Sequence, residues 1–179
     1  IKKKNTDLFV VLEGEKTFSN LINTVINNIG NYDEILSYPL EGIVFIDPKT
    51  KETNHPKLIM GEKSQRIKYL DEIPSPYLNG MMDKFFEQKL TPFLETNRGC
   101  PFKCSFCHTG NDYFQKINNF SIERVVDEIR YIGPKIVEQG IVNLHIADTN
   151  FGMYTRDKMI CEELLRSKNE CGWPLQVMS

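Results

Sequence analysis

Three cysteines in one short segment are the residues best suited to chemistry. Cys100, Cys104 and Cys107 lie within the run Cys-Pro-Phe-Lys-Cys-Ser-Phe-Cys. Thiolates are soft ligands that select iron–sulfur clusters or zinc, and three of them on one loop can converge on a single site. The spacing therefore predicts a metal centre.

Two kinds of centre use such a segment. A closed zinc site needs four ligands, and only His108 lies close enough in the sequence to complete one. A 4Fe–4S cluster held by three cysteines instead leaves one iron without a protein ligand, and that open position can bind a substrate. A zinc knuckle and buried free thiols remain the alternatives at this point.

The cysteine segment resembles the signature of the radical S-adenosylmethionine superfamily, in which an aromatic residue, here Phe106, precedes the third cysteine. The resemblance implies that Cys100, Cys104 and Cys107 bind a 4Fe–4S cluster and that adenine packs near Phe106. It also implies that the open iron binds S-adenosylmethionine, which is reductively cleaved to methionine and a 5′-deoxyadenosyl radical. The radical would abstract hydrogen from a substrate that the sequence does not identify, and a protein such as flavodoxin or ferredoxin would supply electrons.

A wider resemblance links the chain to radical enzymes that carry an N-terminal cobalamin-binding domain. The segments Leu70-Asp-Glu-Ile-Pro-Ser-Pro-Tyr77 and Glu95-Thr-Asn-Arg-Gly-Cys-Pro101 are similar to the join between the two domains of such enzymes. The strand and helix around Gly14 look like the last ones of the Rossmann-like domain. The resemblance implies that the full-length parent could use cobalamin, with methyl transfer to carbon as one outcome.

Two departures from the family pattern concern the cofactors. None of the three histidines lies in an Asp-x-His-x-x-Gly loop, through which a histidine can ligate cobalt. The Gly-Gly-Glu segment that contacts the methionyl amino group in the superfamily is also absent, and residues 147–152 occupy its place. There we expect Asp148 to accept a hydrogen bond from the ammonium and Asn150 to assist, whereas the alternative role of Asp148 is to cap a turn.

The order of apolar patterns predicts an α/β fold. In the first half, an apolar run over 8–12 and helical spacing over 18–29 predict a buried strand followed by an amphipathic helix. Residues 42–54 predict a hairpin whose second arm, 51–54, is polar and exposed. Proline residues and lost periodicity predict a linker over 56–91.

In the second half, a first strand leads into the cysteine segment, and helices and strands alternate after it. The expected elements are a strand over 93–97, a helix over 122–132 that Gly133-Pro134 ends or kinks, a strand over 142–147, a helix over 156–168 and a strand over 175–179. Such alternation predicts parallel strands with right-handed crossovers. The cysteines then follow the carboxyl end of a strand, where parallel α/β barrels assemble their active sites.

The predicted fold is therefore a partial radical S-adenosylmethionine (β/α) barrel preceded by the C-terminal part of a Rossmann-like cobalamin-binding domain. We expect the remnant of the cobalamin-binding-like domain over residues 1–55, the linker over 56–91, and the N-terminal half of the barrel over 92–179. Because the chain starts at Ile1 without a methionine and stops at Ser179 after a strand-like run, we expect a fragment of a longer protein.

Charge and apolar composition indicate which classes of binding partner to expect. Lys and Arg number 22 against 24 Asp and Glu, so a nucleic-acid partner is not expected. No apolar run is long enough to cross a bilayer, and a membrane partner is not expected either. The odd number of cysteines, which includes Cys161 and Cys171 as packing thiols, favours a reducing compartment, the cytoplasm.

The alternative to an enzyme is a non-catalytic iron–sulfur or zinc module for electron transfer or assembly.

Overall fold

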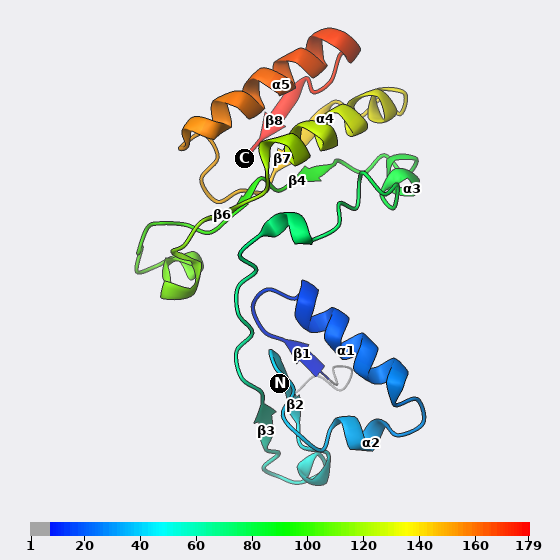
Figure 1. Cartoon of the computed structure of the whole chain (residues 1–179), viewed down its shortest axis with the longest axis vertical. Coiled ribbons are helices and arrows are strands. Elements are labelled where there is room, and N and C mark those ends of the chain that lie inside the picture. The colour runs from blue at the N-terminus through cyan, green and yellow to red at the C-terminus, as the bar shows by residue number, and fades with distance from the viewer. Residues whose placement is uncertain (1–7) are drawn as a thin grey trace. The chain divides into compact units, whose positions relative to one another are not determined.

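The computed structural model describes residues 8–179, and residues 1–7 of the first predicted domain lie outside it. The chain forms two compact units, which divide between Ile67 and Lys68 (Figure 1). No described helix combines the length and the apolar composition that crossing a membrane requires.

The first unit is a three-stranded sheet with one long helix. Its elements are β1 (Leu8–Val10), α1 (Glu15–Asn27), α2 (Tyr32–Ile35), β2 (Ile43–Ile46) and β3 (Leu58–Met60). β2 pairs with both of the other strands, and both pairings are antiparallel. Leu21 of α1 packs on Ile43 and Phe45 of β2 to form the core. The Rossmann-like arrangement expected here is therefore not shown.

The hairpin closes later in the sequence than predicted. Residues 51–54, expected as the second arm, form an exposed turn, and β3 supplies the return strand instead. Asp47 starts the turn because its carboxylate accepts a hydrogen bond from the Lys49 N–H at 2.9 Å. Ile59 packs against the core whereas the polar arm has no apolar side chain to bury, so burial selects the later strand.

The second unit contains the parallel sheet that the sequence predicts. β4 (Phe93–Leu94), β7 (Asn143–Ile146) and β8 (Gln176–Met178) lie in the order β4-β7-β8, and both pairings are parallel. α4 (Ile122–Val137) and α5 (Thr155–Cys171) connect these strands and pack on each other (Figure 1). The strand expected over 93–97 is split, because β5 (Asn97–Arg98) leaves the parallel sheet and pairs antiparallel with β6 (Asn118–Asn119).

α4 continues through Gly133 and Pro134, so of the two outcomes expected there, an end or a kink of the helix, the end is wrong. Its buried face, which includes Ile129, Ile132 and Ile136, spans the proline without a break. A Cβ atom at Gly133 would lie 2.8 Å from Ser167 Oγ, which shows how closely α5 approaches at this position. Helix packing on both sides of Pro134 outweighs the one backbone hydrogen bond that proline removes.

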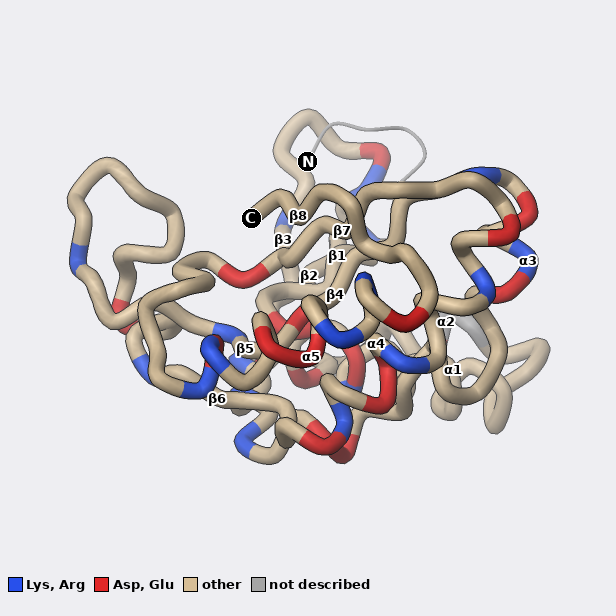
Figure 2. Tube along the Cα trace, turned by 90° about the horizontal axis from the view of Figure 1, so that it is seen from above, with Lys and Arg blue, Asp and Glu red and all other residues tan. Residues whose placement is uncertain are grey.

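Charged residues also join the two helices. Arg130 Nε donates to Glu163 Oε1 at 2.8 Å between α4 and α5. Figure 2 shows acidic and basic residues interspersed along both helices.

The predicted linker is shared between the units. Its first part contributes β3 to the first unit, and its later part packs against the second unit. The Tyr77 hydroxyl donates to the Phe93 carbonyl at 2.6 Å and accepts from the Phe93 N–H at 3.0 Å. Burial raises the pKa of Tyr77 to about 12. Ser75 Oγ donates to Glu128 of α4 at 2.6 Å, so this segment is fixed to both β4 and α4.

The core of the second unit gives a test of this packing. We expect Ile129→Ala to lower the free energy of unfolding by about 2 to 5 kcal/mol, because the fully buried Ile129 leaves a cavity when truncated. Trp173 is the chain's single tryptophan and is fully buried in this unit, so its fluorescence during urea unfolding reports the change. Val137→Ala, at the exposed end of α4, should change the same value by less than about 0.5 kcal/mol.

Candidate functional site

The predicted cluster ligands lie on one loop, residues 99–117, between β5 and β6. We call this segment the cysteine loop. It projects from the second unit (Figure 1) and contains two short 3₁₀ turns, His108–Gly110 and Asp112–Phe114. Cys100 is buried at the start of the loop, whereas Cys104 and Cys107 are exposed. The loop therefore presents two thiols outward from one fixed thiol.

Gly99 sets the direction in which the loop leaves β5. Its φ is +124°, and a Cβ there would lie 2.5 Å from the Lys116 carbonyl oxygen and 2.7 Å from that of Phe114. The Cys100 N–H donates to the same Phe114 carbonyl at 2.8 Å. The two ends of the loop thus touch backbone to backbone, which only glycine allows at this position.

Asp148, directly after β7 and Ala147, anchors the segment that leads into the loop. Its Oδ1 accepts from the N–H groups of Thr96 and Asn97 at 2.7 and 3.2 Å. Its Oδ2 accepts from the Thr96 hydroxyl and from Asn97 Nδ2, the latter at 2.8 Å. Burial raises the pKa of Asp148, and the hydrogen bonds from Thr96 and Asn97 act against that rise.

The same bonds bear on the expected contact between Asp148 and the ammonium of S-adenosylmethionine. A carboxylate has about four acceptor positions, and four donors of this chain already use them. A direct contact with an ammonium would have to replace one of those bonds. The alternative role of Asp148, capping the turn that follows it, is also not what its carboxylate does. The carboxylate instead holds Thr96 and Asn97, which follow β4.

Arg156 is a site residue that the sequence reasoning missed. Its Nη1 donates to the Thr96 carbonyl at 2.9 Å and to Asn119 Oδ1 at 3.0 Å, and its Nη2 donates to the Phe120 carbonyl at 2.6 Å. The guanidinium therefore ties the start of α5 to both strands that flank the cysteine loop. No sequence signal marks it, because its partners are mostly backbone oxygens.

Four buried polar atoms near this network have no hydrogen-bond partner among residues 8–179. They are Asn97 Oδ1, Asn150 Nδ2, the Tyr154 hydroxyl oxygen and Asp157 Oδ1. All four follow the carboxyl ends of β4 and β7, the side of the sheet from which the cysteine loop leaves. Buried polar atoms normally have partners, so these four are consistent with a polar ligand at this end.

The donor set suits an iron–sulfur cluster, although the thiols are not gathered in the described structure. Within residues 8–179 no group of three His, Cys, Asp or Glu side chains is arranged to hold a metal ion. A hydrogen bond with the Thr109 hydroxyl, 3.1 Å from Cys107 Sγ, lowers the pKa of Cys107 and favours the thiolate that binds metals. Phe106, expected near adenine, is 92% exposed on the same loop.

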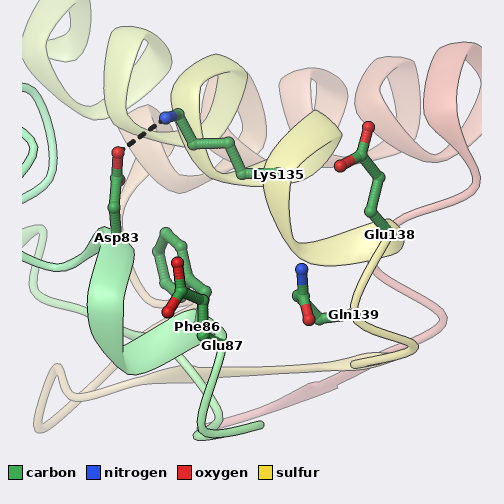
Figure 3. Close-up of a pocket in the computed structure, with 6 residues that line it drawn as sticks. All are labelled: Asp83, Phe86, Glu87, Lys135, Glu138 and Gln139. Carbon is green, nitrogen blue, oxygen red and sulfur yellow. Dashed lines mark hydrogen bonds and ion pairs between the residues drawn. The ribbon is translucent and has the colours of Figure 1, made fainter.

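A separate pocket lies at the other end of the second unit. It has a volume of about 190 Å³ between α3 (Asp83–Phe86) and the carboxyl end of α4 (Figure 3). Lys135 Nζ donates to Asp83 Oδ2 at 2.7 Å, and this bond lowers the pKa of Asp83. Because α4 runs from the cysteine loop toward the start of β7, its carboxyl end is remote from that loop, and the pocket is no part of the site.

Comparisons with known proteins identify relatives of this chain. No family model matches the chain. The chain is 31% identical over 98% of its length to the cobalamin-dependent radical SAM methyltransferase TokK of Streptomyces tokunonensis, where SAM is S-adenosylmethionine. It is also 28% identical over 94% of its length to 2-(S-pantetheinyl)-carbapenam-3-carboxylate methyltransferase of Streptantibioticus cattleyicolor. The predicted resemblance to radical S-adenosylmethionine proteins associated with cobalamin is confirmed.

Solved structures share the fold. The cobalamin-dependent radical enzyme OxsB matches 89% of this chain with a TM-score of 0.59 and 23% identity, and the chain covers 21% of it. The radical methyltransferase TsrM of Kitasatospora setae matches 91% with a TM-score of 0.56 and 16% identity, and the chain covers 30% of it. The chain spans about a quarter of the curated relatives TokK and the carbapenam methyltransferase. These relatives are named as enzymes, which supports the prediction of an enzyme.

The close contact at Gly99 gives a test of the loop. In the full-length parent, Gly99→Ala should lose most of the iron bound after anaerobic reconstitution, because its Cβ would collide with two carbonyl oxygens. Gly140→Ala is the matched control, since Gly140 also has a positive φ, +70°, but open space around a Cβ. That variant should lose about 1 kcal/mol of stability and keep its iron. Equal iron content in the two variants would contradict this account of the loop.

Proposed function

We propose that this chain is part of an enzyme that binds a 4Fe–4S cluster and cleaves S-adenosylmethionine, and that its full-length parent is a cobalamin-dependent methyltransferase. The observation that carries the proposal is the cysteine loop, held at the carboxyl end of a parallel sheet by Asp148 and Gly99. The similarity to named cobalamin-dependent radical methyltransferases over nearly the whole chain supports it.

The proposed ligands of the cluster are Cys100, Cys104 and Cys107. A bound cluster with an open iron supplies one-electron reduction of S-adenosylmethionine. The exposed ring of Phe106 offers an apolar face for adenine, and the unpartnered amide of Asn150 offers donors for the amino-acid end. Asp148 reaches the ammonium only by exchanging one of its four bonds, so its main role is to hold the end of β4.

The domain boundaries, cofactors and reductant proposed next concern the full-length parent protein. We propose residues 1–55 as the remnant of a cobalamin-binding-like domain, 56–91 as the join, and 92–179 as the first half of a radical barrel. Cobalamin would bind the parent, and methyl transfer to carbon is the proposed outcome. OxsB has been solved with aqua-cobalamin and S-adenosylmethionine bound, which supports that cofactor set. A flavodoxin or ferredoxin is the proposed reductant, and the odd cysteine count is the ground for placing the protein in the cytoplasm.

One other function has an observation in its favour. His108 directly follows Cys107 and could complete a four-ligand site with the three cysteines, which a module that binds zinc would need. Such a module would transfer electrons or assist assembly without cleaving S-adenosylmethionine. Zinc without acid-labile sulfide in the purified parent would favour it.

Cluster content tests the ligand assignment. Anaerobic reconstitution of the parent should yield about four irons and four sulfides per chain. Cys104→Ala should abolish the cluster, because two thiolates do not retain it, and the exposed position makes the change harmless to the fold. Cys161→Ala, an exposed thiol on α5, should leave iron and sulfide unchanged. Loss of the cluster in Cys161→Ala would show that the ligands are misassigned.

Binding of S-adenosylmethionine separates the enzyme from the electron-transfer module. We expect the electron paramagnetic resonance spectrum of the reduced, reconstituted parent to change when S-adenosylmethionine is added, because three cysteines leave one iron open to it. Methionine and 5′-deoxyadenosine should then form under reducing conditions. A spectrum that stays the same, with no product, would favour the non-catalytic module.

A further inference from the structure

Glu13 fixes the end of the first unit from which the chain leaves. Its Oε1 accepts a hydrogen bond from Arg66 Nε at 3.0 Å, and its Oε2 accepts from the Ile67 N–H at 2.7 Å. The side chains of Glu13 and Arg66 are only 9% and 12% exposed. Hydrogen bonds to an ionised group are among the stronger polar contacts of a fold. The chain is therefore held to the first unit as far as Ile67.

Leu70 begins the part of the chain that is held to the second unit. Its side chain is fully buried. Asp71 Oδ1 accepts from the Ser121 N–H, directly before α4, at 3.0 Å. The Ile73 carbonyl accepts from Arg124 Nη1 of α4. These contacts fix the chain to α4 from Leu70 onward.

Lys68 and Tyr69 lie between the two fixed segments. Both are exposed, and the side chain of Tyr69 is 62% exposed. Lys68 Nζ lies 5.0 Å from the centroid of the Tyr69 ring, a contact within the pair itself. The Tyr69 carbonyl accepts from the Glu72 N–H at 3.1 Å and so belongs to the turn that follows. Rotation about the backbone of Lys68 and about φ of Tyr69 therefore breaks none of the hydrogen bonds given above.

We propose that Lys68 and Tyr69 are a hinge about which the two units reorient as rigid bodies. Domain hinges are short segments that absorb changes in φ and ψ between elements that stay packed. The boundary between the two compact units falls at this point, between Ile67 and Lys68. Motions of this kind take microseconds to milliseconds.

The hinge goes beyond the proposed function and does not require it, because no cofactor takes part in the contacts that define it. On the proposed function, the first unit belongs to a cobalamin-binding-like domain and the second unit carries the cysteine loop. The hinge would then allow the two cofactor sites of the parent to change their spacing between steps of the reaction.

Distances between spin labels test the hinge in the full-length parent. Nitroxides are attached to genetically encoded ketone amino acids, so that the native cysteines stay unlabelled, and each pair is measured by double electron–electron resonance. The pair Glu52 and Glu162 spans the two units. Two further pairs of exposed positions lie within one unit each, Asn23 with Glu52 and Gln88 with Glu162. We expect a broad distance distribution for the spanning pair and narrow distributions for the other two.

Tyr69→Pro is the variant that stiffens the hinge. Proline fixes φ at its own position and holds the preceding residue, Lys68, in an extended conformation. The distribution of the spanning pair should narrow toward the width of the pairs within one unit. Gln65→Pro is the matched control, because Gln65 is also exposed but lies before the residues that Glu13 holds. The control should keep the wild-type width.

Glu13→Ala should have the opposite effect. It releases Arg66 and Ile67 from Glu13 and so lengthens the hinge, which should broaden the distribution of the spanning pair and leave the pairs within one unit unchanged. An unchanged width of the spanning pair in this variant would overturn the placement of the hinge.

Other outcomes would overturn the hinge itself. A spanning pair as narrow as the pairs within one unit would show that the units do not reorient. A broad distribution that Tyr69→Pro leaves unchanged, or that Gln65→Pro narrows equally, would place the movement elsewhere. Broad distributions for the pairs within one unit would show that the units are not rigid bodies. Each result is read without a cluster or S-adenosylmethionine, so the hinge and the proposed function fail separately.

Discussion

One buried carboxylate, Asp148, holds the candidate site together. It lies directly beyond the end of β7 and binds four donors of Thr96 and Asn97, which lead from β4 into the cysteine loop. A buried carboxylate is tolerated only when its charge is matched by hydrogen bonds, and backbone N–H groups at a strand end supply them here. The interaction converts two neighbouring strand ends into one rigid platform from which Gly99 can direct the loop.

Buried polar groups in the second unit differ in whether they have hydrogen-bond partners. Groups with complete partners, such as the Tyr77 hydroxyl and the Glu128 carboxylate, join elements of the fold to one another. Among the buried atoms without partners, Asn150 Nδ2 and the Tyr154 hydroxyl follow the carboxyl end of β7, whereas Asn143 Oδ1 lies at its start. The atoms beyond the strand end are the ones available to a ligand at the candidate site.

The sequence was sufficient to predict the cysteine loop and the parallel sheet, because ligand spacing and strand–helix alternation are local patterns. It was not sufficient to predict that β3 closes the first sheet or that α4 continues past Pro134, since both depend on packing between distant segments. Asp148 was recognised as a polar residue at a strand end, but its partners lie 52 and 51 residues earlier. Arg156 binds mainly backbone oxygens, which a side-chain pattern does not reveal.

The distance in sequence between Asp148 and its donors has a consequence for biosynthesis. During translation Cys100, Cys104 and Cys107 are synthesised before Asp148, whose carboxylate holds the entry of their loop. Until β7 has been synthesised and has paired with β4, the nascent loop has no fixed entry, and its thiols are open to oxidation and to stray metals. On the proposed function, a cluster that binds the shaped loop has to arrive after β7 has been completed, and the thiols have to stay reduced until then.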